Sequence, residues 1–318
     1  MFKLNNCNAL ITGGAGFIGS HIADRLIAEG ARVRVLDNLS TGNLRNLPKQ
    51  AVFIEGDVRD SSLVAKSMKD IDIVFHEAAQ INPAKAVEDP LFDFENNARG
   101  TLELLLAAKA ESVKRFVMAS TNVYGNAVVE QMSESFSTLA ERGSLLSPYA
   151  AAKVCGEAYL KVANDEFGLP TVRLRYFNVY GPRQLAKSES GVIALFTINA
   201  LAKKPILIFG SGKQTRDFVY VDDVVEANIL AAKCEGAMGG VFNVGTGHET
   251  SINELADLVC DLGNAAVPIE HVENRAADFS RAVADLSQAR AVLGFEPKIT
   301  LREGLRRYLE WYIRREEF

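Results

Sequence analysis

The sequence predicts an α/β fold in which a doubly wound parallel sheet is joined to a smaller mixed α/β domain. Two observations predict it: apolar, β-branched runs alternate with helix-length segments in the first half, and this alternation becomes less regular after Asn178. Strands that alternate with helices are typical of a parallel sheet covered on both faces. The strands expected in this sheet are Ala9–Thr12, Arg32–Asp37, Val52–Glu55, Ile71–His76, Arg115–Ser120 and Thr171–Phe177.

Helices are expected where apolar residues recur at helical spacing. In the first half these segments are Phe17–Glu29, Asp93–Ala110 and Tyr149–Phe167. In the second half the expected helices are Val192–Ala202, Asp222–Lys233, Ile252–Leu262 and Leu301–Trp311, and the expected short strands are Ile206–Phe209 and Val241–Val244. We therefore expect two joined domains, residues 1–177 and 178–318, with the chain crossing back to the first near 213–247.

The composition excludes several classes of protein. The chain has 318 residues and is 48% hydrophobic, which is enough to bury a large core. Its net charge of −5 disfavours binding to nucleic acid or to an anionic membrane through the overall field. The four cysteines are scattered, so we expect reduced thiols. The sequence begins without a cleavable signal pattern, and no apolar run approaches the ~20 residues that span a bilayer, so cytoplasmic residence is expected.

A glycine-rich turn joins the first expected strand to the first expected helix. Its glycines fit two registers, Gly13, Gly16 and Gly19 or Gly14, Gly16 and Gly19. In either register they allow a tight turn and let the backbone approach a pyrophosphate at the positive end of a helix dipole. The alternative is a turn that serves packing alone. The acidic Asp37 at the end of the next strand favours a dinucleotide site of the Rossmann type.

Asp37 also bears on the choice of cofactor. A carboxylate there accepts hydrogen bonds from the ribose hydroxyls, whereas the 2′-phosphate of NADP would meet a like charge. No arginine follows within residues 37–42, so NAD is predicted. Asp57 and Val58 follow the third strand at the edge of the same cleft. Asp57 either accepts from the adenine amino group, which we favour, or caps a turn.

Tyr149 and Lys153 lie in the first turns of a helix that Ser147 and Pro148 begin. Their spacing of four puts the phenol and the ammonium on one helix face. A tyrosine with the ordinary pKa of about 10 is a poor base, and the pKa must fall by about 3 units for the phenol to ionise near neutrality. Lys153 and a positive nicotinamide ring are the expected causes. Taken alone, a tyrosine and a lysine at this spacing are more typical of a surface contact than of a catalytic pair.

Two further strand ends belong to the same constellation. In an open parallel sheet, ligands bind beyond the carboxyl ends of the strands. Ser120 and Thr121 end the fifth strand and are expected to hydrogen-bond a substrate hydroxyl. The fourth strand ends at His76, which we interpret as structural, and the small Ala78 and Ala79 that follow allow the nicotinamide ribose to pack close to the backbone.

Taken together, these residues resemble the extended short-chain dehydrogenase/reductases that act on nucleotide sugars, over about residues 8–311. The resemblance also includes three ordered motifs: Asn97-Ala-Arg-Gly-Thr101, Arg175-Tyr-Phe-Asn-Val-Tyr-Gly-Pro-Arg183 and Thr215-Arg-Asp-Phe-Val-Tyr-Val-Asp-Asp223. It implies an NAD-binding domain over 1–177 and a substrate-binding domain over 178–318. The cofactor contacts assigned in this way are Gly13, Gly16, Phe17, Ile18, Gly19, Asp37, Asn38, Asp57, Val58, Ala78, Ala79, Gln80, Asn97, Tyr149 and Lys153.

Within that group the chain looks most like UDP-galactose and UDP-N-acetylglucosamine 4-epimerases. The resemblance implies a catalytic triad of Ser120, Tyr149 and Lys153, no metal, and a homodimer that pairs the helices Asp93–Ala110 and Tyr149–Phe167. The substrate contacts that it implies are Ser120, Thr121, Asn122, Tyr149, Asn178, Arg216, Arg275 and Ala282. Salt bridges on a solvated face are the alternative role for the two arginines.

Two positions help to choose the reaction and the substrate. Dehydratases of this group carry an Asp-Glu pair where this chain has Thr121 and Asn122, neither of which is a carboxylic acid, and this argues for epimerisation. Ala282 matches a wall position at which a bulky tyrosine excludes an N-acetyl group, so a UDP-N-acetylhexosamine is plausible beside UDP-glucose and UDP-galactose, unless Phe279 or Arg281 fills the space. The alternatives left open are a UDP-glucuronate 4-epimerase, a 4,6-dehydratase, a reductase, and a non-catalytic NAD-binding regulator.

Overall fold

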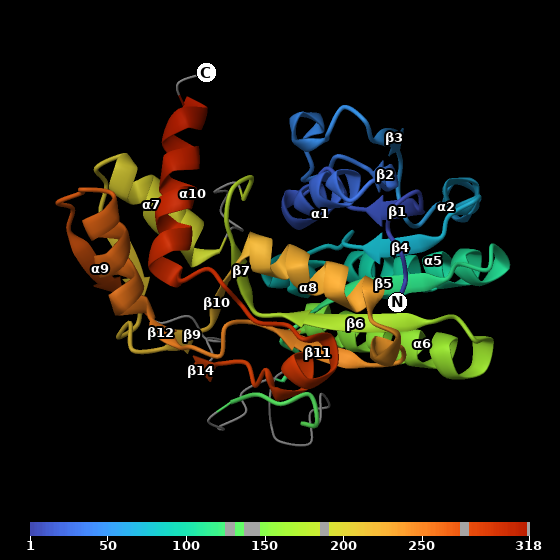
Figure 1. Ribbon diagram of the computed structural model, residues 1–318. Helices are drawn as coiled ribbons and strands as arrows, with labels where there is room; N and C mark the ends of the chain where they lie inside the picture. Colours follow the sequence, from blue (N-terminus) through green and yellow to red (C-terminus); the bar gives the residue numbers. More distant parts are fainter. Residues whose placement is uncertain (125–130, 137–146, 185–190, 274–279, 317–318) are drawn as a thin grey trace.

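The computed structural model describes residues 1–124, 131–136, 147–184, 191–273 and 280–316 (Figure 1). Among these residues the main sheet has seven strands in the order β11-β6-β5-β4-β1-β2-β3, and every adjacent pair is parallel. The strands are β1 (Asn8–Thr12), β2 (Arg32–Asp37), β3 (Val52–Glu55), β4 (Ile73–His76), β5 (Arg115–Thr121), β6 (Thr171–Tyr176) and β11 (Val241–Val244). The predicted parallel α/β fold is confirmed.

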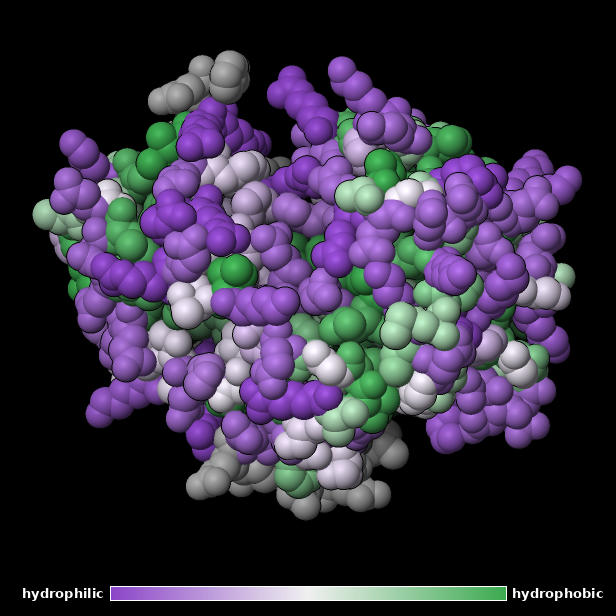
Figure 2. Space-filling model, in the orientation of Figure 1, coloured by the Kyte–Doolittle hydropathy of each residue, from purple (hydrophilic) through white to green (hydrophobic). Residues whose placement is uncertain are grey.

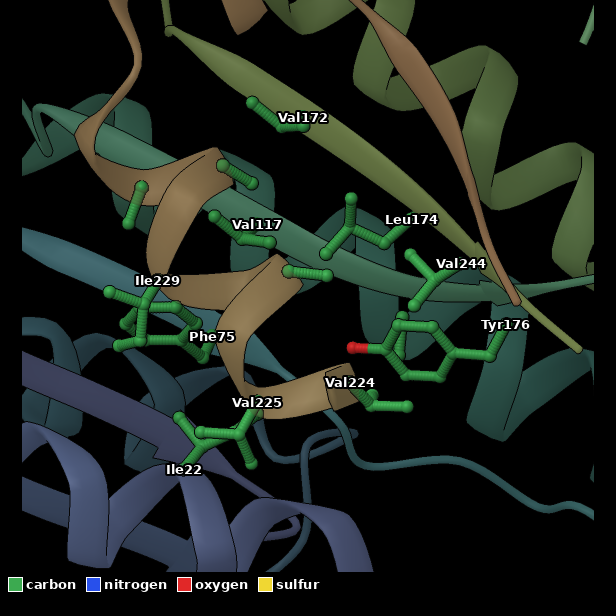
Figure 3. Packing of buried hydrophobic residues seen from close by; sticks show 14 of the residues in the cluster. Ile22, Phe75, Val117, Val172, Leu174, Tyr176, Val224, Val225, Ile229 and Val244 are labelled. Atoms are coloured by element: carbon green, nitrogen blue, oxygen red, sulfur yellow. The ribbon is translucent and has the colours of Figure 1, made fainter. Parts of the chain in front are cut away.

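Helices cover both faces of the main sheet. On one face α1 (Phe17–Ala28) and α8 (Val221–Lys233) pack against the strands, and Figure 3 shows Val225 of α8 beside Ile22 of α1 and Ile229 of α8 beside Phe75 of β4. The opposite face is covered by α2 (Ser61–Met68), α5 (Gly100–Ala110) and α6 (Pro148–Phe167). Their buried apolar residues pack together with those of the strands, so burial of apolar surface holds the three layers in place.

The strand order reverses between β1 and β4. From β1 the chain adds β2 and β3 on one side of the sheet, and from β4 it adds β5 and β6 on the other. In open α/β sheets a crevice forms at such a switch point, beyond the carboxyl ends of the strands. Thr12 and His76 are register partners at these ends of β1 and β4, and they lie directly below the crevice.

The single helix predicted over Asp93–Ala110 is more complex. Two short helices, α3 (Pro83–Glu88) and α4 (Pro90–Phe94), precede a π-turn at Glu95–Arg99, and α5 follows without a break. Both short helices begin at a proline after a side-chain cap, from Asn82 and Asp89 respectively. The hydrophobic periodicity predicted that this stretch is helical, but it does not predict the one-residue insertion that forms the π-turn.

The rest of the chain forms the smaller mixed α/β part on the left of Figure 1. Its described strands form three small sheets: β7 (Asn178–Tyr180) with β10 (Phe218–Tyr220), β8 (Ile206–Phe209) with β13 (Ile269–Val272), and β12 (Thr250–Ser251), β9 (Thr215–Arg216) and β14 (Arg281–Ala282). Its helices α7 (Val192–Leu201), α9 (Ile252–Leu262) and α10 (Leu301–Glu316) share one apolar cluster. None of the helices in the described ranges is both long and apolar enough to cross a bilayer.

Candidate active site

The glycine turn between β1 and α1 brings backbone segments very close together. Gly13 has a φ of +69°, and a Cβ there would lie 2.7 Å from the backbone nitrogen of Ala78. A Cβ on Gly19 would lie 2.4 Å from the carbonyl oxygen of Gly13. Helix α1 begins after Gly16 without a side-chain cap, so its first amides and the positive end of its dipole remain available to an anion. This geometry fits a pyrophosphate.

A cavity of about 520 Å³ lies at the switch point of the sheet. It is bounded by the glycine turn, the ends of β2 and β3, and the segment after β4. Of the predicted cofactor residues, those in its wall are Gly13, Gly16, Phe17, Ile18, Gly19, Asp37, Asn38, Val58, Ala78, Ala79 and Gln80. In Figure 2 the surface is notched at the top of the view, between α10 and the part of the chain that carries α1 and β2.

Two carboxylates near this cavity have different partners. Asp37 accepts hydrogen bonds from the amides of Ala15 (2.9 Å) and Leu39 (2.8 Å), while its burial raises its pKa. Asp57 accepts from the amide and the guanidinium of Arg59 and from Asn38 Nδ2, and the bond from Arg59 holds its pKa down to about 2. Asp57 therefore forms a turn and an ion pair in this structure, and its contact with the adenine amino group stays a prediction.

The segment after β4 is held by a buried amide. Asn97 donates to the Gln80 carbonyl oxygen (2.9 Å) and accepts from the Gln80 amide (2.9 Å), and it is only 1% exposed. Asp93 Oδ1 accepts from both the Gln80 and Asn97 side chains, at 2.8 and 2.9 Å. Because both ends of the Asn97 amide are engaged, Asn97 positions the cavity wall, and its direct contact with the cofactor stays a prediction.

The phenol of Tyr149 is brought to the carboxyl end of β5. It hydrogen-bonds the Thr121 side chain, while Lys153 Nζ donates to the carbonyl oxygen of Ala119 at 3.0 Å. Burial raises the pKa of Tyr149 to about 12 and lowers that of Lys153 to about 8. Burial is therefore the largest influence on the Tyr149 pKa, ahead of the Thr121 hydrogen bond that lowers it and the Asp93 charge that raises it.

Ser120 lies beside this pair but makes a different contact. Its hydroxyl donates to Glu157 Oε1 at 2.6 Å, and Arg175 donates to both Glu157 oxygens, at 2.9 and 2.6 Å. Tyr124 completes the network, because its hydroxyl accepts from Arg175 at 3.0 Å. The Ser120 proton is thus committed to Glu157, and Thr121 is the hydroxyl that contacts the phenol.

Residues 9–245 match the NAD dependent epimerase/dehydratase family. The chain belongs to this family. It is 41% identical to a putative UDP-glucose 4-epimerase of Methanocaldococcus jannaschii over 95% of this chain and 97% of that protein. The structure resembles UDP-glucose 4-epimerase of Thermotoga maritima with UDP-glucose (39% identity, TM-score 0.92, 97% of this chain and 99% of that one). It also resembles UDP-N-acetylglucosamine 4-epimerase of Methanobrevibacter ruminantium in complex with UDP-N-acetylmuramic acid (35% identity, TM-score 0.92, 98% and 99%).

Epimerase/dehydratase family members use NAD, and the glycine turn, the open end of α1 and Asp37 fit that cofactor. In the described ranges, the predicted substrate residues are not among those that line the cavity wall described above. Asn178 begins β7, Arg216 lies in β9, and the neighbouring Ala282 of β14 is completely buried. Asn122 accepts from the Thr121 hydroxyl at 3.3 Å. Arg275 lies outside the described residues.

Sequence reasoning missed several buried charged residues of this family member. Glu157 follows Lys153 by four residues, as Lys153 follows Tyr149, so its place on the same helix face was a usable signal. Asp93 was seen only as the start of a helix. Asp217 is fully buried and accepts four hydrogen bonds, from Thr246, Gly247 and Ala284, which fasten the loop after β11 to β14. Only the folded chain reveals these partners.

Proposed function

We propose that this chain catalyses the NAD-dependent 4-epimerisation of a UDP-hexose. The observation that carries the proposal is the arrangement of Tyr149, Thr121 and Lys153 at the end of β5, next to the segment that lines the cofactor cavity. They provide the phenol of Tyr149, the Thr121 hydroxyl that is hydrogen-bonded to it, and the buried amine of Lys153 one helical turn away. Together they can exchange a proton with a sugar hydroxyl held between them and the cofactor.

In the proposed mechanism Tyr149 accepts the proton of the sugar 4-hydroxyl and later returns it. Ser120, oriented by Glu157, shares a hydrogen bond with that sugar oxygen. Thr121 hydrogen-bonds the phenol and orients it. Lys153 lies one helical turn away, and its ammonium would stabilise the phenolate, because a nearby positive charge favours the charged form. Held by the glycine turn and Asp37, NAD would supply the acceptor and donor of the hydride of carbon 4, and its positive ring would further favour the phenolate. Since both transfers are reversed within one turnover, the protein needs only this one acid–base group.

For the substrate we propose UDP-glucose and UDP-galactose, with UDP-N-acetylhexosamines as a second class. Asn178, Arg216 and Arg275 would bind the diphosphate, because a guanidinium fork donates two parallel bonds to phosphate oxygens. The similarity to the UDP-N-acetylglucosamine 4-epimerase of Methanobrevibacter ruminantium supports the second class. Ala282 is small but completely buried, so an N-acetyl group would need the side chains that cover it to move aside. We also propose that residues 1–177 bind the cofactor and 178–318 the sugar nucleotide, and that the enzyme works in the cytoplasm, where its four free thiols would stay reduced.

We further propose a homodimer that pairs α5 and α6 with their copies. These two helices pack side by side and carry apolar side chains that remain exposed: Leu106 (47%), Tyr159 (40%) and Val162 (42%). Exposed apolar side chains on neighbouring helices are typical of an interface. Sedimentation equilibrium should give twice the 34.6 kDa of one chain, and a monomer at assay concentrations would rule the pairing out.

A direct test of the reaction is incubation of the purified protein with NAD and, separately, UDP-glucose, UDP-N-acetylglucosamine and UDP-glucuronate, with products identified by NMR. We expect the 4-epimer of the first, and of the second if Ala282 leaves room. A 4-keto-6-deoxy product would instead identify a dehydratase, and stoichiometric consumption of added NADH a reductase. Tight NAD binding without turnover of any sugar nucleotide would favour the non-catalytic regulator.

A further inference from the structure

The carboxyl group of Glu77 lies in the wall of the cofactor cavity, and the proposed mechanism does not use it. Glu77 directly follows the last residue of β4, and its amide donates to the carbonyl oxygen of Thr12. The backbone here is fixed from both sides, because a Cβ on Gly13 would lie 2.9 Å from the Glu77 carbonyl carbon. The residue keeps some accessible surface, as expected for one that lines a cavity, while protein surrounds most of its carboxyl group.

A directed chain of hydrogen bonds holds this carboxyl group in place. The Tyr176 hydroxyl donates to Glu77 Oε1 at 2.9 Å and accepts from Asn228 Nδ2 at 2.7 Å. Asn228 is completely buried in α8, and its Nδ2 also donates to the Val224 carbonyl oxygen. Figure 3 shows Tyr176 with its hydroxyl pointing in between α8 and the sheet. The phenol has one proton and gives it to Glu77, so this network presents only a donor to the carboxylate.

The charges around Glu77 place it at the catalytic end of the cavity. In the described part of the chain, the titratable side chains that act on it are Lys153 from α6 and Tyr176 from β6. Burial raises the pKa of Glu77 to about 7, against the opposing effects of the Tyr176 bond and the Lys153 charge. A carboxyl group in this environment changes charge near neutral pH, close to the site at which the nicotinamide ring would meet Tyr149.

We propose that Glu77 sets the balance between oxidised and reduced cofactor in the site, by placing a negative charge near the nicotinamide end of the cavity. This inference rests on the proposed function, because it requires the nicotinamide to bind beside Tyr149 and Lys153. The oxidised ring is positive and the reduced ring is neutral. A carboxylate close to the ring therefore stabilises the oxidised form, whereas it interacts much less with the reduced form. The Tyr176–Asn228 chain keeps that charge at a fixed position.

The test compares dissociation constants for NAD⁺ and NADH, measured by calorimetry at pH 8 and pH 6, in wild type and Glu77→Gln. At pH 8 the replacement should weaken NAD⁺ binding relative to NADH binding by about tenfold, the equivalent of one pKa unit of interaction. In wild type the preference for NAD⁺ should fall towards pH 6 as Glu77 becomes protonated. In Glu77→Gln the ratio of the two dissociation constants should change less between pH 8 and pH 6, because the carboxyl group that titrates in wild type is absent.

Two controls keep the outcomes distinct. Glu111→Gln removes the same charge from an exposed position at the end of α5 and should leave the ratio unchanged. Glu77→Asp keeps the charge and should stay close to wild type at pH 8. Equal ratios for wild type and Glu77→Gln at pH 8 would overturn the inference, and so would a wild-type ratio that does not change between the two pH values. Failure of the wild-type protein to bind either form would instead overturn the proposed function.

Discussion

Tyr149→Phe should lower kcat by about 10²–10⁴-fold, the usual contribution of a positioned acid–base group, while NAD binding is retained. The replacement removes only the hydroxyl, so the ring still fills its place at the start of α6 and the contacts of the cavity wall remain. The loss should appear in kcat and in kcat/KM alike, because the phenol acts in the transition state. The loss of turnover is measured as product formation by NMR, and the retention of the cofactor as NAD affinity by calorimetry.

A matched control for this prediction lies on the same helix. Tyr159 is 40% exposed on α6, ten residues further along, so Tyr159→Phe removes a hydroxyl remote from the cavity and should leave kcat within about twofold of wild type. Near-normal turnover in Tyr149→Phe would show that another group takes the proton. Loss of NAD binding together with turnover would instead show that the phenol is needed to hold the cofactor.

The cofactor cavity could be predicted from the sequence because its parts are local. The glycine turn, the end of the next strand and the alanines after β4 each lie within a few residues of a strand end, and parallel strands bring such ends to one edge. The fold followed from the same alternation. Hydrophobic periodicity does not predict a local irregularity, such as the π-turn that puts Asn97 beside Gln80.

The polar contacts inside the site could not be predicted in the same way. The Tyr176 hydroxyl meets Glu77 across 99 residues and Asn228 across 52, so only the assembled sheet and α8 bring the three together. Likewise, sequence spacing could not tell which of Ser120 and Thr121 would face the phenol. Both hydroxyls have their partners on α6, Glu157 for Ser120 and Tyr149 for Thr121, so the choice depends on how that helix is placed against the end of β5.

The second large effect is expected from the Glu157–Arg175 pair beneath the catalytic residues. Both side chains are only 6% exposed, and Arg175 donates to both carboxylate oxygens. Glu157→Gln removes the negative charge and leaves the guanidinium as a buried, uncompensated cation, which should cost about 3–5 kcal/mol of unfolding free energy. Urea denaturation measures this loss. As a control, Asp261→Asn breaks the exposed pair with Arg302 and should cost less than about 1 kcal/mol.

A double variant separates the stability that the pair confers from its positioning of Ser120. Glu157→Leu combined with Arg175→Met removes both charges, so most of the lost stability should return, because apolar residues of similar volume can replace a buried ion pair. Turnover should nevertheless stay below wild type, since the Ser120 hydroxyl no longer has the acceptor that orients it 2.6 Å away. Recovery of stability and turnover together would contradict this positioning role and reduce the pair to a structural contact.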